Sequence, residues 1–142
     1  CYNLPNFSQS EIELLRNYLD KDHNYRMKIT PVRMRALIDD GFRMYSKEAF
    51  AADAWMNFSA LVSPDSVDSN HIIPNLQITP YVWAYGCNSG SYNSVALTIY
   101  TDQFAKQSIQ GIFTIFFGSY LGDYDSQDNL MRAAIASYPS IL

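Results

Sequence analysis

Blocks of apolar residues along this chain predict three short core strands, and a helical pattern separates each strand from the next. A short apolar run between glycines or turn residues is typical of a strand in a parallel sheet, because such a strand is covered on both faces. Residues 35–41, 81–85 and 111–117 fit this description. The third run is the most apolar, and we expect it to be buried on both faces.

The clearest helix start lies near the amino terminus. Ser8 and Glu11 have the spacing of a capping box, in which a hydroxyl and a carboxylate satisfy each other's backbone N–H groups. The sequence therefore predicts a helix over residues 9–22. The apolar face of this helix is formed by residues at helical spacing, namely Ile12, Leu15 and Leu19.

Three more helices are expected further along the chain. One begins at Ser46 and ends near Leu61, a short one covers residues 102–107, and Asp125 caps the last one. Between residues 63 and 79, prolines and scattered polar residues predict a loop. Within that loop we expect one short strand, at residues 71–73.

The alternation of helices and strands decides the expected fold class. Such an order is typical of a parallel sheet with helices on both faces. We therefore expect one α/β domain over residues 1–142, built as a three-layer sandwich with a mainly parallel sheet. Sheets usually have about four to six strands, and only three are predicted here. The chain is thus expected to be an incomplete piece of a larger domain.

Composition narrows the possible classes of function. With 142 residues, of which 48% are hydrophobic, the chain can form a packed core. A net charge of −4 and the lack of a basic cluster argue against a nucleic-acid partner. No apolar run is long enough to span a membrane. The 11 tyrosines and 8 phenylalanines, beside few lysines, favour an extracellular protein.

The carboxyl ends of the second and third predicted strands carry the candidate chemistry. Open α/β folds bind ligands at that edge of the sheet, and here it receives the thiol of Cys87 and the hydroxyl of Ser119. Cys87 is interpreted as a small buried thiol, with a nucleophile or a disulfide to Cys1 as alternatives. Nearby glycines can offer backbone N–H groups to a ligand or simply permit tight turns. These glycines are Gly86, Gly90, Gly118 and Gly122.

Acidic residues suggest one candidate cofactor, calcium. Asp123, Asp125 and Asp128 can supply carboxylate oxygens to Ca²⁺, although they lack the spacing of an EF-hand. The alternative is that Asp125 and Asp128 stabilise the start of the last helix. Asp39 and Asp40 are interpreted as turn residues rather than a metal pair. No other cofactor is expected.

Several short motifs resemble the gingipain family of secreted bacterial cysteine peptidases. Residues 36–40 (Ala-Leu-Ile-Asp-Asp) are similar to the acidic turn after the family's first strand. Residues 84–88 (Ala-Tyr-Gly-Cys-Asn) stand where the family has Tyr-Ile-Gly-His-Gly, which carries the catalytic histidine. Residues 119–124 (Ser-Tyr-Leu-Gly-Asp-Tyr) have the spacing of the nucleophile motif Cys-x-x-Gly-Asp-Phe. The resemblance implies a caspase-like fold.

The departures from the family pattern shape the functional hypothesis. The resemblance places Cys87 at the histidine position and Ser119 at the cysteine position, so both catalytic residues are replaced. His23 and His71 are expected at surface or loop positions. The resemblance thus implies a secreted or cell-surface bacterial protein that binds a protein or peptide, or assembles, without cleaving. The alternatives are an active peptidase that uses Cys87 or Ser119, and a structural subunit of an extracellular assembly.

Overall fold

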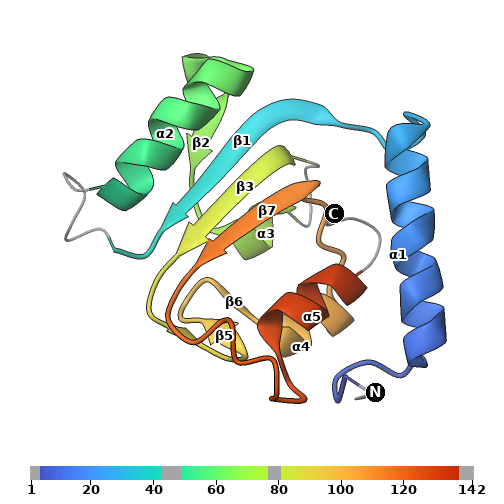
Figure 1. Ribbon diagram of the computed structural model, residues 1–142. Coiled ribbons are helices and arrows are strands. Elements are labelled where there is room, and N and C mark those ends of the chain that lie inside the picture. The colour runs from blue at the N-terminus through green and yellow to red at the C-terminus, as the bar shows by residue number, and fades with distance from the viewer. Residues whose placement is uncertain (1–3, 43–48, 77–80, 138–142) are drawn as a thin grey trace.

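The computed structural model describes residues 4–42, 49–76 and 81–137 and shows an α/β architecture (Figure 1). Its main sheet has four parallel strands in the order β2-β1-β3-β7. The strand bounds are Arg33–Asp40 (β1), Val67–Ser69 (β2), Tyr81–Cys87 (β3) and Phe113–Phe117 (β7). A small antiparallel sheet is formed by Gly90–Ser91 (β4), Ser94–Val95 (β5) and Ile99–Tyr100 (β6).

Helices flank the main sheet on both faces, as the alternating sequence pattern predicted (Figure 1). Alternate residues of each strand point to opposite faces, so Ile38 packs towards one layer of helix and Leu37 towards the other. The helix bounds are Glu11–Arg26 (α1), Ala49–Val62 (α2), Ile72–Leu76 (α3), Thr101–Lys106 (α4) and Leu130–Ala136 (α5), with a 3₁₀ turn at Pro64–Ser66 (η2).

Each face of the sheet carries its own hydrophobic cluster. The cluster under α2 joins strand residues to helix residues: Ala36, Ile38, Val67, Tyr85 and Cys87 with Ala54 and Phe58. The opposite cluster lies against α3, α4 and α5 and includes Leu37, Ala84, Ile72, Leu76, Phe104, Leu130 and Ala134. The sheet is therefore the middle layer of three.

The loop predicted at residues 63–79 holds a strand that the sequence analysis placed wrongly. The strand is β2, which pairs with β1 through Ala36 opposite Val67. Residues 72 and 73, part of the predicted strand at 71–73, instead begin α3. The cause is tertiary, because the Asp39 carboxylate accepts the Ile72 N–H at 2.9 Å and so supports the start of the helix.

The first helix is confirmed, but its predicted cap and buried face are wrong. Ser10 caps α1, and Glu13 completes the capping box by accepting the Ser10 N–H at 2.8 Å. The same three-residue spacing thus occurs two residues later than predicted. The expected apolar face is exposed at all three positions, Ile12, Leu15 and Leu19. The buried residues of α1 are Leu14 and Lys21.

The buried Lys21 connects α1 to the end of α5. Its ammonium group donates to the carbonyl oxygens of Ile135 at 2.8 Å and Ser137 at 2.6 Å. Burial lowers the pKa of Lys21 to about 8, since a charged amine is costly away from water. The buried side of α1 therefore includes a charged residue, which the apolar spacing of this helix did not predict.

Two predictions near the carboxyl end also need correction. Strand β7 lies at the edge of the sheet and is not buried on both faces, because Ile115 and Phe117 are 45% and 44% exposed. The last helix is capped by Asn129, whose side chain accepts the Arg132 N–H at 3.1 Å, and not by Asp125.

Strand order creates a switch point between β1 and β3. The chain leaves β1 through α2 on one face to reach β2, then passes through α3 on the other face to reach β3. Open α/β sheets bind ligands in the crevice beyond the carboxyl ends of strands at such a point. The next question is which side chains lie there.

Candidate functional site

The carboxyl ends of β1, β3 and β7 lie side by side, as the parallel register requires. Asp40 is opposite Cys87, and Cys87 is opposite Phe117. Ser119 follows Phe117 by two residues, so the thiol and the hydroxyl are delivered to the same edge of the sheet. Only the thiol, however, lies within the packed structure.

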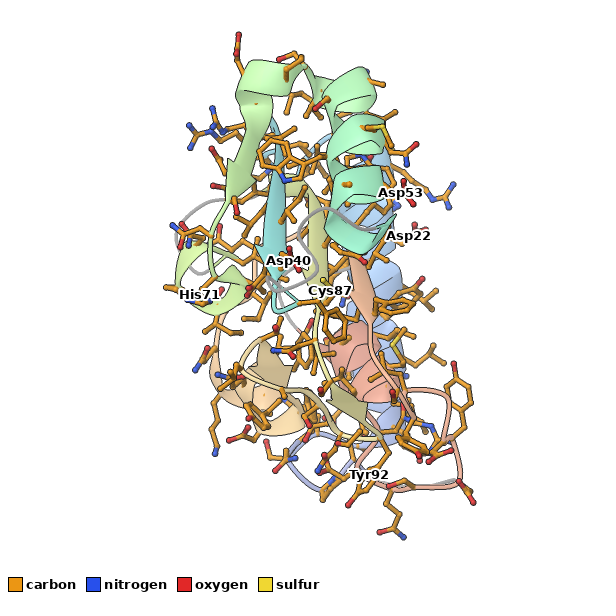
Figure 2. All side chains as sticks on the ribbon, turned by 90° about the vertical axis from the view of Figure 1, so that its left-hand side faces the viewer. Asp22, Asp40, Asp53, His71, Cys87 and Tyr92 are labelled. Atoms are coloured by element: carbon orange, nitrogen blue, oxygen red, sulfur yellow. The ribbon has the colours of Figure 1, made fainter. Side chains whose placement is uncertain are left out.

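Cys87 is a buried free thiol (Figure 2). Its exposed fraction is 0%, and its Sγ donates to Oδ1 of Asp40 at 3.4 Å. Burial, followed by the hydrogen bond and negative charge of Asp40, raises the pKa of Cys87 to about 11. The thiol is therefore protonated at neutral pH, and a thiolate is the form that attacks a carbonyl. Cys1, the disulfide partner in the alternative interpretation, lies outside the described residues.

Asp40 forms the turn that follows β1. Its Oδ1 also accepts the Phe42 N–H at 3.0 Å, and the Gly41 N–H donates to the Cys87 carbonyl at 2.7 Å. A Cβ on Gly41 would lie 2.3 Å from the amide nitrogen of Asn88, so only glycine fits between the two strand ends. The interpretation of Asp40 as a turn residue agrees with these contacts. Its bond to Cys87 was not anticipated.

Asp39 faces the other layer and supports α3. Its side chain is 4% exposed, and Oδ1 lies 3.5 Å from Nδ1 of His71. His71 is itself mostly exposed, which agrees with the expected surface or loop position. In the sheet order β1-β3-β7, His71 lies on the β1 side, whereas Ser119 follows β7. His71 is thus next to Asp39 of β1, and β3 lies between β1 and β7, the strand that Ser119 follows.

A small pocket of about 200 Å³ opens at the switch point. The residues that line it come from the ends of β1 and β3, from the turn before α3 and from the turn between β5 and β6: Asp39, Asp40, Gly41, His71, Asn88, Leu97 and Thr98. Asn88 is fixed, since its amide nitrogen donates to the Ala96 carbonyl at 2.7 Å. Leu97 adopts a left-handed backbone with φ of 58°, a conformation that non-glycine residues rarely take. Two carboxylates, Asp39 and Asp40, thus line the pocket.

Ser119 lies in a loop that packs closely on the β4 turn. Among the described residues, no hydrogen bond involves its hydroxyl group. A Cβ on Gly90 would lie 2.4 Å from the Ser119 carbonyl, and one on Gly118 would lie 3.0 Å from the Cα of Gly90. These glycines allow two loops to touch. None of the described glycines has a positive φ, so the expected role in tight turns is replaced by close packing.

Gly86 and Gly122 differ from that pair. A Cβ on Gly86 would lie 2.8 Å from Cδ1 of Ile72 and 2.9 Å from Cγ2 of Thr98, so this glycine serves core packing. Around Gly122 nothing lies within 4 Å of such a Cβ. A ligand therefore has no room where a Gly86 side chain would be, whereas the same space beside Gly122 is open.

The three aspartates of the predicted acidic cluster have different surroundings. Asp128 accepts from the side-chain amides of Asn6 at 3.0 Å and Asn93 at 3.2 Å, which ties the amino-terminal segment to the small sheet. Asp123 and Asp125 are exposed on the loop after β7. Within residues 4–42, 49–76 and 81–137, no group of three or more His, Cys, Asp or Glu side chains is placed to hold a metal ion.

Comparison of the chain with protein-family models, curated proteins and solved structures finds no match. Among the described residues there is also no helix with the length and apolar character needed to cross a membrane. The chemistry of the site must therefore be argued from its own residues. The sequence placed Cys87 at the carboxyl end of a core strand, and the structure has it at the end of β3. It did not single out Asn88, Leu97 or Thr98, because the turn between β5 and β6 reaches this pocket only through tertiary packing.

Proposed function

We propose that this chain is part of a secreted or cell-surface bacterial protein with a gingipain-like, caspase-like fold that binds a protein or peptide without cleaving it. The observation that carries the proposal is the state of Cys87. At the position where the resemblance expects a catalytic histidine, the chain has a buried thiol that donates to Asp40. Such a group neither accepts a proton as imidazole does nor ionises readily.

The hydroxyl at the other family position supports the same proposal. A serine attacks a carbonyl only when a base removes its proton. Ser119 forms no side-chain hydrogen bond among the described residues, and His71 lies next to Asp39 instead. Binding then depends on the shape and charge of the carboxyl edge, where Asp39 and Asp40 line the switch-point pocket.

Calcium remains a candidate only for the loop after β7. Asp123 and Asp125 are exposed there and can contribute carboxylate oxygens, while Asp128 already accepts from Asn6 and Asn93. A calcium ion held by two exposed carboxylates would be weakly bound and would order the loop rather than take part in chemistry.

Peptide cleavage is the direct test of the proposed function. The protein is incubated with a broad peptide mixture under reducing conditions, with and without Ca²⁺, and the products are identified by mass spectrometry. Cys87→Ala and Ser119→Ala variants serve as matched controls. We expect no cleavage above the level of either variant. Cleavage that disappears in one variant would identify the nucleophile and replace the proposal with an active peptidase.

A second candidate, a structural subunit of an extracellular assembly, is favoured by a separate observation. Among the described residues, β7 pairs with a strand on one side only, and its apolar Ile115 side chain is nearly half exposed. This edge is distinct from the switch-point pocket, so assembly and ligand binding are compatible.

A further inference from the structure

The switch-point pocket contains a buried side chain whose hydroxyl group has no hydrogen-bond partner. Thr98 lies in the turn between β5 and β6 and is 5% exposed. Its methyl group packs towards the core, since Cγ2 lies 2.9 Å from the position of a Cβ on Gly86. Among the described residues, no side chain or backbone group forms a hydrogen bond with the Thr98 hydroxyl. Buried polar groups without a partner are uncommon, and each one calls for an explanation.

The pocket is where the Thr98 hydroxyl meets solvent. Within the part of the chain that the structure describes, Thr114 alone has a fully enclosed side-chain oxygen without a partner. The Thr98 oxygen is therefore not fully enclosed, and the opening that Thr98 lines is the pocket of about 200 Å³. A ligand in this pocket can thus reach a hydroxyl group that is held in place by a packed turn.

Two carboxylates of β1 line the same pocket and have unused acceptor positions. Asp39 accepts the Ile72 N–H through Oδ2, while its Oδ1 has only a long contact of 3.5 Å with Nδ1 of His71. Asp40 uses Oδ1 for both of its hydrogen bonds, and its Oδ2 bonds to no described residue. Together with Thr98, these side chains offer three oxygen acceptors to a ligand, and two of the groups are negatively charged.

We propose that the pocket binds a primary ammonium group, held by the carboxylates of Asp39 and Asp40 and by the Thr98 hydroxyl. An ammonium group has three N–H donors and no acceptor, which matches three oxygen acceptors. Its positive charge matches the two carboxylates, and hydrogen bonds to charged groups are the stronger ones. The exposed Leu97 gives the pocket an apolar side for the carbon atoms next to the nitrogen. This inference rests on the proposed function and names the chemical group that the carboxyl edge recognises.

The size and the ligands of the pocket favour an ammonium group over a metal ion. Ca²⁺ takes about six to eight oxygen ligands, and within residues 4–42, 49–76 and 81–137 no three acidic, histidine or cysteine side chains are grouped to hold a metal. A volume of about 200 Å³ fits a small molecule or the end of a longer one. The ammonium group therefore belongs either to a small free amine or to the amino terminus of a peptide.

Titration with n-butylammonium, followed by the NMR shifts of backbone amides, tests the proposal. We expect saturable shifts at Gly41, Asn88 and Thr98, and none with n-butanol, which has the same carbon chain without the charge. Thr98→Val keeps the shape of the side chain but removes the hydroxyl, so the Kd is expected to rise about tenfold. The matched control is Thr114→Val, which removes the other unpartnered hydroxyl, outside the pocket, and leaves the Kd unchanged. Circular dichroism confirms that both variants remain folded.

A second titration separates the two sources of the ammonium group. Shifts caused by alanyl-alanine amide, and not by its N-acetyl form, assign the pocket to a peptide amino terminus, whereas shifts caused by n-butylammonium alone assign it to a small free amine. The proposal would be overturned by the absence of shifts with every ammonium compound, by equal shifts with n-butanol, or by saturation with Mg²⁺ or Ca²⁺ in place of the amine. An unchanged Kd in Thr98→Val would also overturn it. The peptide-cleavage assay is independent of these titrations, so the inference and the non-catalytic function can fail separately.

Discussion

Strands β3 and β7 are neighbours with similarly apolar sequences and very different surroundings. In β3 every residue except Trp83 is buried, whereas none of the five residues of β7 is. β3 has a strand on each side and helices over both faces, while β7 has one neighbouring strand and an open groove. Apolar sequence alone therefore does not distinguish a central strand from an edge strand.

The comparison is tested most strongly by removing matched aliphatic side chains. Leu37 is fully buried in the middle of the sheet, and Leu37→Ala is expected to lower the free energy of unfolding by about 2–5 kcal/mol. Ile115→Ala, at a half-exposed position of β7, is expected to cost about 1 kcal/mol. Urea unfolding of both variants measures the difference. Equal losses would mean that β7 is as enclosed as the central strands.

The two loop glycines at the carboxyl edge provide the next contrast. A Cβ on Gly90 would lie 2.4 Å from the Ser119 carbonyl, so Gly90→Ala is expected to cost about 1–3 kcal/mol. Gly122 has open space around it, and Gly122→Ala is expected to change stability by about 0.5 kcal/mol or less. Thermal unfolding compares the two. Equal melting temperatures for Gly90→Ala and Gly122→Ala would contradict the close contact between Gly90 and the Ser119 loop.

Much of the fold could be predicted from the sequence, because hydrophobic runs and helical spacing are local signals. They located β1, β3 and α4 and predicted a parallel sheet between helices. Errors arose where a distant residue decides the local structure. The Asp39 carboxylate supports the start of α3, where a strand was predicted. The edge position of β7 likewise depends on strand order, which no local pattern records.

The candidate site was predictable only in part. The sequence identified Cys87 as a buried thiol, since it ends an apolar strand. It did not reveal the Asp40 acceptor, because the two residues are 47 positions apart and meet only through the register of β1 and β3. The contact between Asp39 and His71 depends in the same way on how α3 packs.

The enclosed side of the molecule should also show a pH dependence that the exposed edge lacks. Burial lowers the pKa of Lys21 to about 8 in the folded chain, below the value of 10.5 for an exposed lysine. Between about pH 8 and 9 the unfolded chain binds more protons at Lys21, so stability is expected to rise with pH there, by about 1 kcal/mol. Above about pH 9 the raised pKa of Cys87 acts in the opposite sense, because the folded chain then holds the thiol proton more tightly. Lys21→Met should abolish the rise. Urea unfolding from pH 7.5 upwards, with both proteins, checks it.

Asp40→Asn produces the smallest expected effect and isolates the charge beside Cys87. Asparagine keeps an oxygen acceptor for the thiol but removes the negative charge that helps to raise the Cys87 pKa. We expect faster alkylation of Cys87 at mildly alkaline pH, although burial, the larger cause, still keeps the rate low. Asp65→Asn, on the exposed η2 turn, is the control. An unchanged alkylation rate in Asp40→Asn would show that the charge of Asp40 does not affect the ionisation of Cys87.

The titration of Cys87 tests the central claim most directly. In a Cys1→Ser background, the ultraviolet absorbance of the chain minus that of its Cys87→Ala variant separates the Cys87 thiolate from the 11 tyrosines, which also ionise at alkaline pH. Circular dichroism monitors folding in parallel. The account predicts ionisation near pH 11, as expected for a buried thiol beside a carboxylate. A thiol that is half ionised at or below neutral pH would be a competent nucleophile and would contradict the non-catalytic function.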